Sequence, residues 1–194
     1  RNELGDTARQ PLSADGVSAT PRMAVMRTTA ELREGFLSFF EEQGHLRCPS
    51  YPLIPRADDR STLYISAGMQ PQMPFFLGRE APPAALTTTV QKCFRTVDID
   101  EVGDNRHTTF FEMLGNFSFG DYFKKEAIQY AWDFLTKVLK IPAEKLWITV
   151  FKDDKESEEI WLQEIKADPK RFSRCGEKDN FWSMGETGPC GPCT

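Results

Sequence analysis

The chain has 194 residues, of which 40% are hydrophobic and 27% are charged, and its formal net charge is −5. This length and composition suit one globular domain or a large part of one, and the negative charge excludes a protein whose whole surface wraps nucleic acid. No stretch approaches the roughly 20 apolar residues of a membrane-spanning helix, so we expect no membrane partner. Five cysteines, an odd number, favour reduced thiols and a cytoplasmic location over a disulfide framework.

The first predicted element is a helix. Thr28 followed three residues later by Glu31 forms a capping-box pattern, and apolar residues recur at helical spacing over 32–40. Gly44 is expected to end the helix in the left-handed conformation that glycine adopts most easily.

The middle of the chain has the character of β-structure. Residues 62–66 predict a short strand, and prolines predict irregular structure over 71–83. Two longer runs, 87–97 and 107–119, are rich in Thr, Val and Phe with period-two character. An acidic, glycine-containing loop over 98–106 separates them, so we expect a long antiparallel hairpin.

Helices and strands alternate after the hairpin. Asp121 is expected to cap an amphipathic helix with an apolar face from Phe123 to Val138. Residues 146–151 predict a strand, and residues 156–166 predict a second short helix. Both Trp147 and Trp161 are expected in the core. This order of elements indicates an α+β fold, in which helices flank an antiparallel sheet.

Cations and aromatic residues come together on the predicted hairpin. Phe94 and Arg95 lie on its first strand, and Arg106 stands four residues before Phe110 on the second. A guanidinium can bind a phosphate or carboxylate with two parallel hydrogen bonds, and an aromatic ring can stack on a purine. From spacing alone a plainer interpretation remains open, in which Arg95 pairs with the loop acids and the Phe rings are core.

Several blocks of sequence resemble one enzyme family. An aromatic–arginine pair, a loop and an Arg-x-x-x-Phe pattern are typical of motif 2 in class II aminoacyl-tRNA synthetases. Residues 66–69, 106–123 and 179–194 are similar, nearly without interruption, to the alanyl-tRNA synthetase family of that class. Such long blocks are more specific than a short motif. The resemblance covers roughly residues 27–194 in order.

The resemblance implies an alanine–tRNA ligase activity, in which ATP and Mg²⁺ activate alanine and the product is transferred to the 3′ end of tRNA(Ala). Arg95 would be the catalytic residue that grips the ATP α-phosphate and the alanine carboxylate. Arg106 and His107 would face the outer phosphates of ATP, and Phe111 would stack on adenine.

The resemblance also implies an alanine pocket. Trp182 and Met69, together with Arg95, would bind alanine. Residues 45–69 correspond loosely to motif 1, with its proline at Pro55.

The chain also departs from the family pattern. Residues 96–103 form a short, acidic loop without the lysine that often contacts ATP, and motif 3 is absent. We therefore expect residues 27–194 to be a partial class II catalytic domain, truncated before motif 3 and inactive alone. Residues 1–26 are expected to be disordered or upstream sequence. Editing and most tRNA contacts would lie beyond residue 194, and no oligomeric state follows from the sequence.

Other interpretations rest on single features. The Cys190-Gly-Pro-Cys193 sequence matches the thioredoxin redox box, but no strand precedes it as the thioredoxin fold requires. A zinc site would need two further ligands, so no metal is expected in this chain, and zinc is a candidate only for other parts of a longer protein. A non-catalytic synthetase-like protein that binds ATP or RNA is the main alternative function.

Overall fold

The computed structural model describes residues 28–97, 99–184 and 188–194. The expectation for residues 1–26 therefore lies outside the described residues. None of the helices in the described part of the chain is long and apolar enough to cross a membrane.

Helix α1 spans Thr29–Glu42 and begins as predicted. The Thr28 hydroxyl accepts a hydrogen bond from the Glu31 backbone N–H at 3.2 Å, and the Glu31 carboxylate accepts one from the Thr28 N–H at 2.8 Å. These two bonds satisfy N–H groups that have no partner within a helix. Gly44 follows the helix with a φ of +87°, so the glycine stop is also confirmed.

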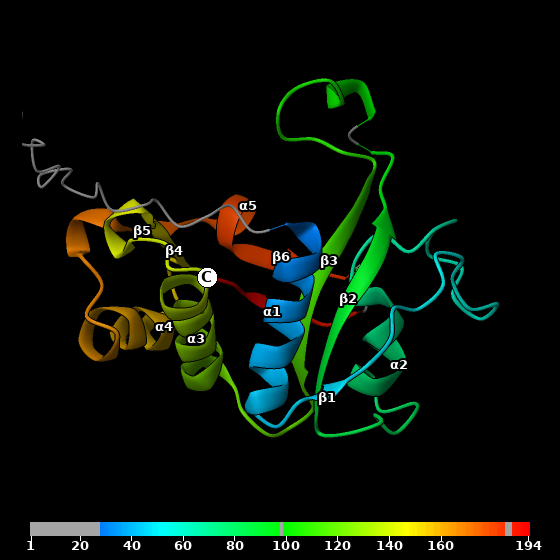
Figure 1. Ribbon diagram of the computed structural model, residues 1–194, viewed down its shortest axis with the longest axis horizontal. Helices are drawn as coiled ribbons and strands as arrows, with labels where there is room; N and C mark the ends of the chain where they lie inside the picture. The colour runs from blue at the N-terminus through cyan, green and yellow to red at the C-terminus, as the bar shows by residue number, and fades with distance from the viewer. Residues whose placement is uncertain (1–27, 98, 185–187) are drawn as a thin grey trace, which may run out of the picture.

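The predicted hairpin is the longest β-element of the molecule. Strands β2 (Leu86–Phe94) and β3 (Phe110–Ser118) pair antiparallel over nine rungs, and strand β1 (Leu46–Arg47) adds to β2 in parallel. The loop between β2 and β3 projects beyond the sheet and carries the 3-10 turn Ile99–Glu101 (Figure 1). Both strands are shorter than predicted at this end.

The two faces of the hairpin are covered by different parts of the chain. Directly paired residues share a face, so odd-numbered residues of β2 and β3 lie together on what we call the odd face. Helix α1 lies on the even face, where Arg33 pairs with Glu112 at 2.8 Å. The segment 49–79, which includes the 3-10 turn Gln70–Gln72 and helix α2 (Met73–Phe76), covers the odd face.

Helix α3 (Lys124–Asp133) lies between two apolar clusters and continues as a π-helical turn, Phe134–Val138. Phe134 packs edge-on against Phe36 of α1, with ring centres 5.3 Å apart. On the other side Ile128 joins the second cluster, which contains Ile148, Val150, Ile160, Trp161 and Ala167. The helix thereby connects the hairpin half of the fold to the following half.

That following half contains two small sheets. Strands β4 (Ile148–Phe151) and β5 (Phe172–Cys175) pair in parallel, and β6 (Phe181–Ser183) pairs antiparallel with β7 (Cys190–Pro192). The helical elements here are α4 Lys155–Glu159, the π-helical turn Ile160–Glu164, α5 Glu177–Asn180, and the 3-10 turns Ala143–Lys145 and Pro169–Arg171. The α+β class is confirmed, and the short parallel pairs add to the antiparallel hairpin.

Four local predictions are wrong. Residues 62–66 form no strand, because isolated bonds rather than a ladder hold their backbone, and 71–83 is partly helical. The start of α3 differs from the prediction: the helix begins only at Lys124, with Phe123 in place of Asp121 as its N-cap residue, and Phe123 is 72% exposed instead of lying on the apolar face. Trp161 is buried as expected, but Trp147 is 66% exposed beneath the Arg171 guanidinium.

A buried polar network joins the end of α1 to β3. His45 is 4% exposed, and its Nδ1 lies 3.1 Å from the Phe40 carbonyl oxygen while its Nε2 lies 2.9 Å from the Tyr122 hydroxyl. Because a carbonyl only accepts, Nδ1 carries a proton, and in the neutral imidazole Nε2 accepts from the Tyr122 hydroxyl. The Asn116 amide then donates to the same hydroxyl at 2.9 Å. The network fits a neutral imidazole.

This network predicts a pH-dependent stability. Burial lowers the pKa of His45 below its usual value of 6.5, so the unfolded chain takes up a proton at a pH where the folded chain does not. The free energy of unfolding should fall as pH drops below 6.5 towards the folded-state pKa. We expect His45→Asn, although less stable at neutral pH, to lose less stability between pH 7.5 and 5.5 in urea unfolding. An equal loss in both proteins would contradict this.

Candidate functional site

Arg95 and Phe111 meet on the odd face at the loop end of the hairpin. The Arg95 Cζ lies 5.2 Å from the centre of the Phe111 ring. The register explains this contact, because Phe111 pairs with Cys93, two residues before Arg95. One cation and one ring are therefore held side by side by the strand pairing.

The main chain orients the Arg95 guanidinium. Its Nε and Nη2 donate to the carbonyl oxygen of Ser66 at 3.2 and 3.0 Å. Among the described residues Arg95 forms no ion pair with a loop acid, although Asp98 lies outside them. Within that same part of the chain Nη1 has no hydrogen-bond partner, so this nitrogen is available to a phosphate or carboxylate.

The segment 66–69 docks on the odd face beside Arg95. The backbone N–H of Gly68 donates to the Met113 sulfur at 3.1 Å, and a Cβ at Gly68 would lie 3.5 Å from that sulfur. Gly68 is buried and Met69 is half-buried. This docking places the Ser66 carbonyl within hydrogen-bond distance of the Arg95 guanidinium.

Arg106 and His107 lie on the loop between β2 and β3. Their backbone N–H groups donate to Asp104 Oδ1 at 2.8 and 2.7 Å, and Asp104 Oδ2 lies 2.8 Å from His107 Nδ1. The backbone bond from His107, the one from Arg106 and the imidazole bond lower the Asp104 pKa to about 2. The structure ties both predicted residues to Asp104, and among the described residues no hydrogen bond or ion pair joins either to Arg95.

Trp182 lies on β6 and is 38% exposed. Asn180 bonds Cys193 at the end of the β6–β7 pair. Its side-chain Nδ2 donates to the Cys193 carbonyl at 2.8 Å, and its main-chain carbonyl accepts from the Cys193 N–H at 2.9 Å. No hydrogen bond or ring contact in the described residues joins Trp182 to Met69 or Arg95.

The Cys190–Cys193 pair lacks the structural setting of a redox box. Cys190 begins strand β7 instead of preceding a helix, and no disulfide involves any of the five cysteines. Within residues 28–97, 99–184 and 188–194, no group of three or more His, Cys, Asp or Glu side chains could hold a metal ion.

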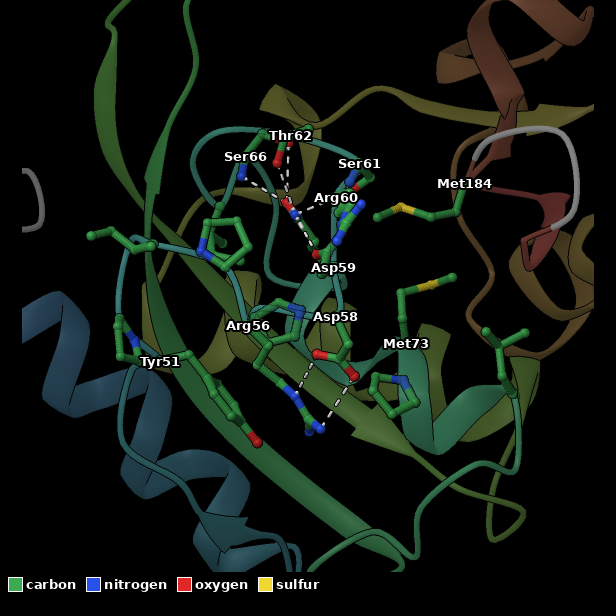
Figure 2. A pocket seen from close by; sticks show the side chains of 18 of the residues that line it. Tyr51, Arg56, Asp58, Asp59, Arg60, Ser61, Thr62, Ser66, Met73 and Met184 are labelled. Carbon is green, nitrogen blue, oxygen red and sulfur yellow. Dashed lines mark hydrogen bonds and ion pairs between the residues drawn. The ribbon is translucent and has the colours of Figure 1, made fainter.

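A cavity of about 740 Å³ adjoins the Arg95 site (Figure 2). Ser66 lines it, and Tyr51 and Met184 lie on opposite sides of it. Gln70, 3% exposed, fixes one wall by donating to Asp59 at 2.8 Å and accepting from the Ser66 N–H at 3.0 Å. None of the site residues predicted from sequence lines this cavity. Its walls come mainly from residues 51–79, which include Pro55 of the predicted motif 1 segment, and from Ser183 and Met184.

A family model described as class II (A) tRNA synthetases matches residues 31–194. The chain belongs to the class II tRNA synthetases. The matched region of this class II synthetase contains the complete hairpin, the loop with Asp104, and Trp182.

Curated relatives with the name alanine–tRNA ligase are similar over most of the chain. The protein of Caldicellulosiruptor saccharolyticus is 59% identical over 168 residues, which cover 86% of this chain and 19% of the relative. Those of Legionella pneumophila strain Lens and Nitrosococcus oceani are 58% and 57% identical over 86% and 87% of this chain, and 20% of each relative. The chain spans about a fifth of the length of these relatives.

Proposed function

We propose that this chain is part of the catalytic domain of an alanine–tRNA ligase. The observation that carries the proposal is the contact between Arg95 and Phe111 on the odd face, with Arg95 Nη1 available for an anion. The high identity to alanine–tRNA ligases supports alanine as the amino acid. The substrates would be ATP, L-alanine and tRNA(Ala).

The chemistry of activation fits what the residues offer. The alanine carboxylate attacks the α-phosphorus of ATP, a P–O bond forms, and pyrophosphate leaves with the electrons of the broken P–O bond. No protein nucleophile is needed, so the protein acts by aligning the reactants and offsetting negative charge. Arg95 does this at the α-phosphate and the carboxylate, while the Phe111 ring supports adenine.

The outer parts of the substrates would meet other residues. Arg106 and His107 would bind the β- and γ-phosphates, and Trp182 with Met69 would surround the alanine methyl group. Mg²⁺ would enter as the counter-ion of ATP and reduce the charge of the phosphates.

The proposal is tested on the complete protein by ATP–pyrophosphate exchange. We expect exchange that depends on alanine and exceeds exchange with glycine by roughly 10- to 200-fold, since one methyl group contributes about 1–3 kcal/mol. ATP binding without any exchange would instead favour the non-catalytic alternative, for which the lysine-free loop is the motivating feature. Failure to bind ATP would contradict the proposed activity and would leave only the RNA-binding form of the alternative.

A further inference from the structure

The loop between β2 and β3 carries an acid at a place where the proposed chemistry disfavours negative charge. Asp104 precedes Arg106 and His107, the two residues proposed to meet the outer phosphates. A carboxylate beside a triphosphate repels it unless donors compensate its charge. Asp104 therefore needs a physical explanation.

The geometry supplies this explanation. Three donors surround the carboxylate, namely the backbone N–H groups of Arg106 and His107 and the imidazole Nδ1 of His107, at 2.8, 2.7 and 2.8 Å. The two backbone bonds fix the chain direction where both side chains emerge. The imidazole bond directs the opposite ring nitrogen, Nε2, away from Asp104.

The side chains of Asp104 and His107 are 38% and 40% exposed, so the arrangement lies at the surface of the loop. Little apolar packing is available there to hold the loop in one conformation, and in its absence ordering a backbone residue costs about 1–2 kcal/mol. Hydrogen bonds to a charged acceptor are stronger than neutral ones. The carboxylate thus contributes three hydrogen bonds that help to order this part of the loop.

We propose that Asp104 is a positioning residue that holds Arg106 and His107 in the orientation needed to bind the outer phosphates of ATP. This inference rests on the proposed function of the hairpin. Asp104 would not touch the substrate itself. Replacing Asp104 would weaken the binding of ATP and not that of alanine, because the alanine carboxylate is assigned to Arg95, as is the α-phosphate.

The test is steady-state ATP–pyrophosphate exchange with the complete protein. We expect Asp104→Ala to raise the KM for ATP roughly tenfold, because lost bonds worth about 1.4 kcal/mol give a factor of 10. The kcat at saturating ATP and the KM for alanine should change less than threefold. Asp104→Asn keeps an oxygen acceptor for the backbone N–H groups and should restore part of the ATP affinity.

Asp100→Ala is the matched control. Asp100 is an exposed acid of the same loop, on the 3-10 turn Ile99–Glu101, with no hydrogen bond or ion pair in the described residues. Replacing Asp100 changes the loop charge by the same amount as replacing Asp104 but breaks no bond to Arg106 or His107. If these bonds are the cause, Asp100→Ala should leave the KM for ATP unchanged. An equal rise in Asp100→Ala and Asp104→Ala would show a general charge effect and overturn the inference.

Other outcomes separate this inference from the proposed function. If Arg95→Ala abolishes exchange while Asp104→Ala keeps the wild-type KM for ATP, only the role of Asp104 is wrong. If Asp104→Ala lowers kcat and raises the KM for alanine by as large a factor as it raises the KM for ATP, a role in positioning Arg106 and His107 for ATP is also excluded. If the wild-type protein shows no exchange, equilibrium binding of ATP decides, and equal Kd values for wild type and Asp104→Ala would overturn the inference.

Discussion

Replacing Arg95 with alanine in the complete protein is expected to lower alanine-dependent ATP–pyrophosphate exchange by at least about 100- to 1,000-fold. Removal of one preorganised donor to a transition-state oxyanion has an effect of this size. Arg95 carries both the charge and the available Nη1, and the ring of Phe111 cannot replace either. The exchange rate at saturating ATP and alanine is the measurement.

Two further variants make this prediction specific. Arg95→Lys keeps the charge, but one ammonium group cannot both bond the Ser66 carbonyl and grip a phosphate with two parallel donors, so we expect only a small recovery. Arg171→Ala removes an arginine that lies over Trp147, away from the hairpin, and should keep full activity. Wild-type exchange by a folded Arg95→Ala protein would remove Arg95 from the reaction.

Replacing Gln91 with methionine is expected to destabilise the chain by about 3 kcal/mol. Gln91 is fully buried on the odd face, and its side-chain oxygen accepts from the Tyr51 N–H at 2.9 Å. Its amide nitrogen donates to the carbonyl oxygens of Tyr51 and Lys92 at 3.1 and 2.8 Å. Methionine has a similar volume but leaves these partners unsatisfied, at about 1 kcal/mol or more each. Urea unfolding followed by tryptophan fluorescence measures the loss.

Gln129→Met is the control for this substitution. Gln129 is exposed on α3, and in the described part of the chain its amide bonds only to Asp133 of the same helix, at 2.8 Å. Its replacement should change the free energy of unfolding by less than about 0.5 kcal/mol. Equal effects of the two substitutions would show that Gln91 does not hold the segment 49–79 on the sheet.

The sequence predicts an element correctly where residues close together in the chain determine its structure. The capping box at Thr28 and Glu31 and the stop at Gly44 depend on contacts within a few residues. The hairpin is predictable because its two strands are long and alternate in character. The same period of two places Arg95 and Phe111 on one face of the sheet.

Predictions that depend on distant partners are less successful. Residues 62–66 have strand-like composition, yet none of the described strands pairs with them, and Leu63 is 86% exposed. Strand β5 has no clear signal in the sequence, because its four residues become a strand only by pairing with β4. Hydrophobicity alone predicts Trp147 in the core, but the Arg171 guanidinium covers its ring at the surface.

In the candidate site too, features that depend on distant contacts could not be predicted from the sequence. The Ser66 carbonyl that orients Arg95 is a main-chain group, and no residue type marks it in a sequence. In the sequence nothing distinguishes Asp104 from the other acids of the loop. Its three donors come together only in the folded loop. The roles of Met69 and Trp182 in alanine binding stay predictions.

The most direct test is a crystal structure of the complete protein with a non-hydrolysable analogue of alanyl-adenylate. We predict adenine stacked on Phe111 and the group that replaces the α-phosphate within hydrogen-bond distance of the Arg95 guanidinium. An analogue bound instead in the neighbouring cavity between Tyr51 and Met184, with Arg95 bonded to the Ser66 carbonyl alone, would contradict this account of the hairpin.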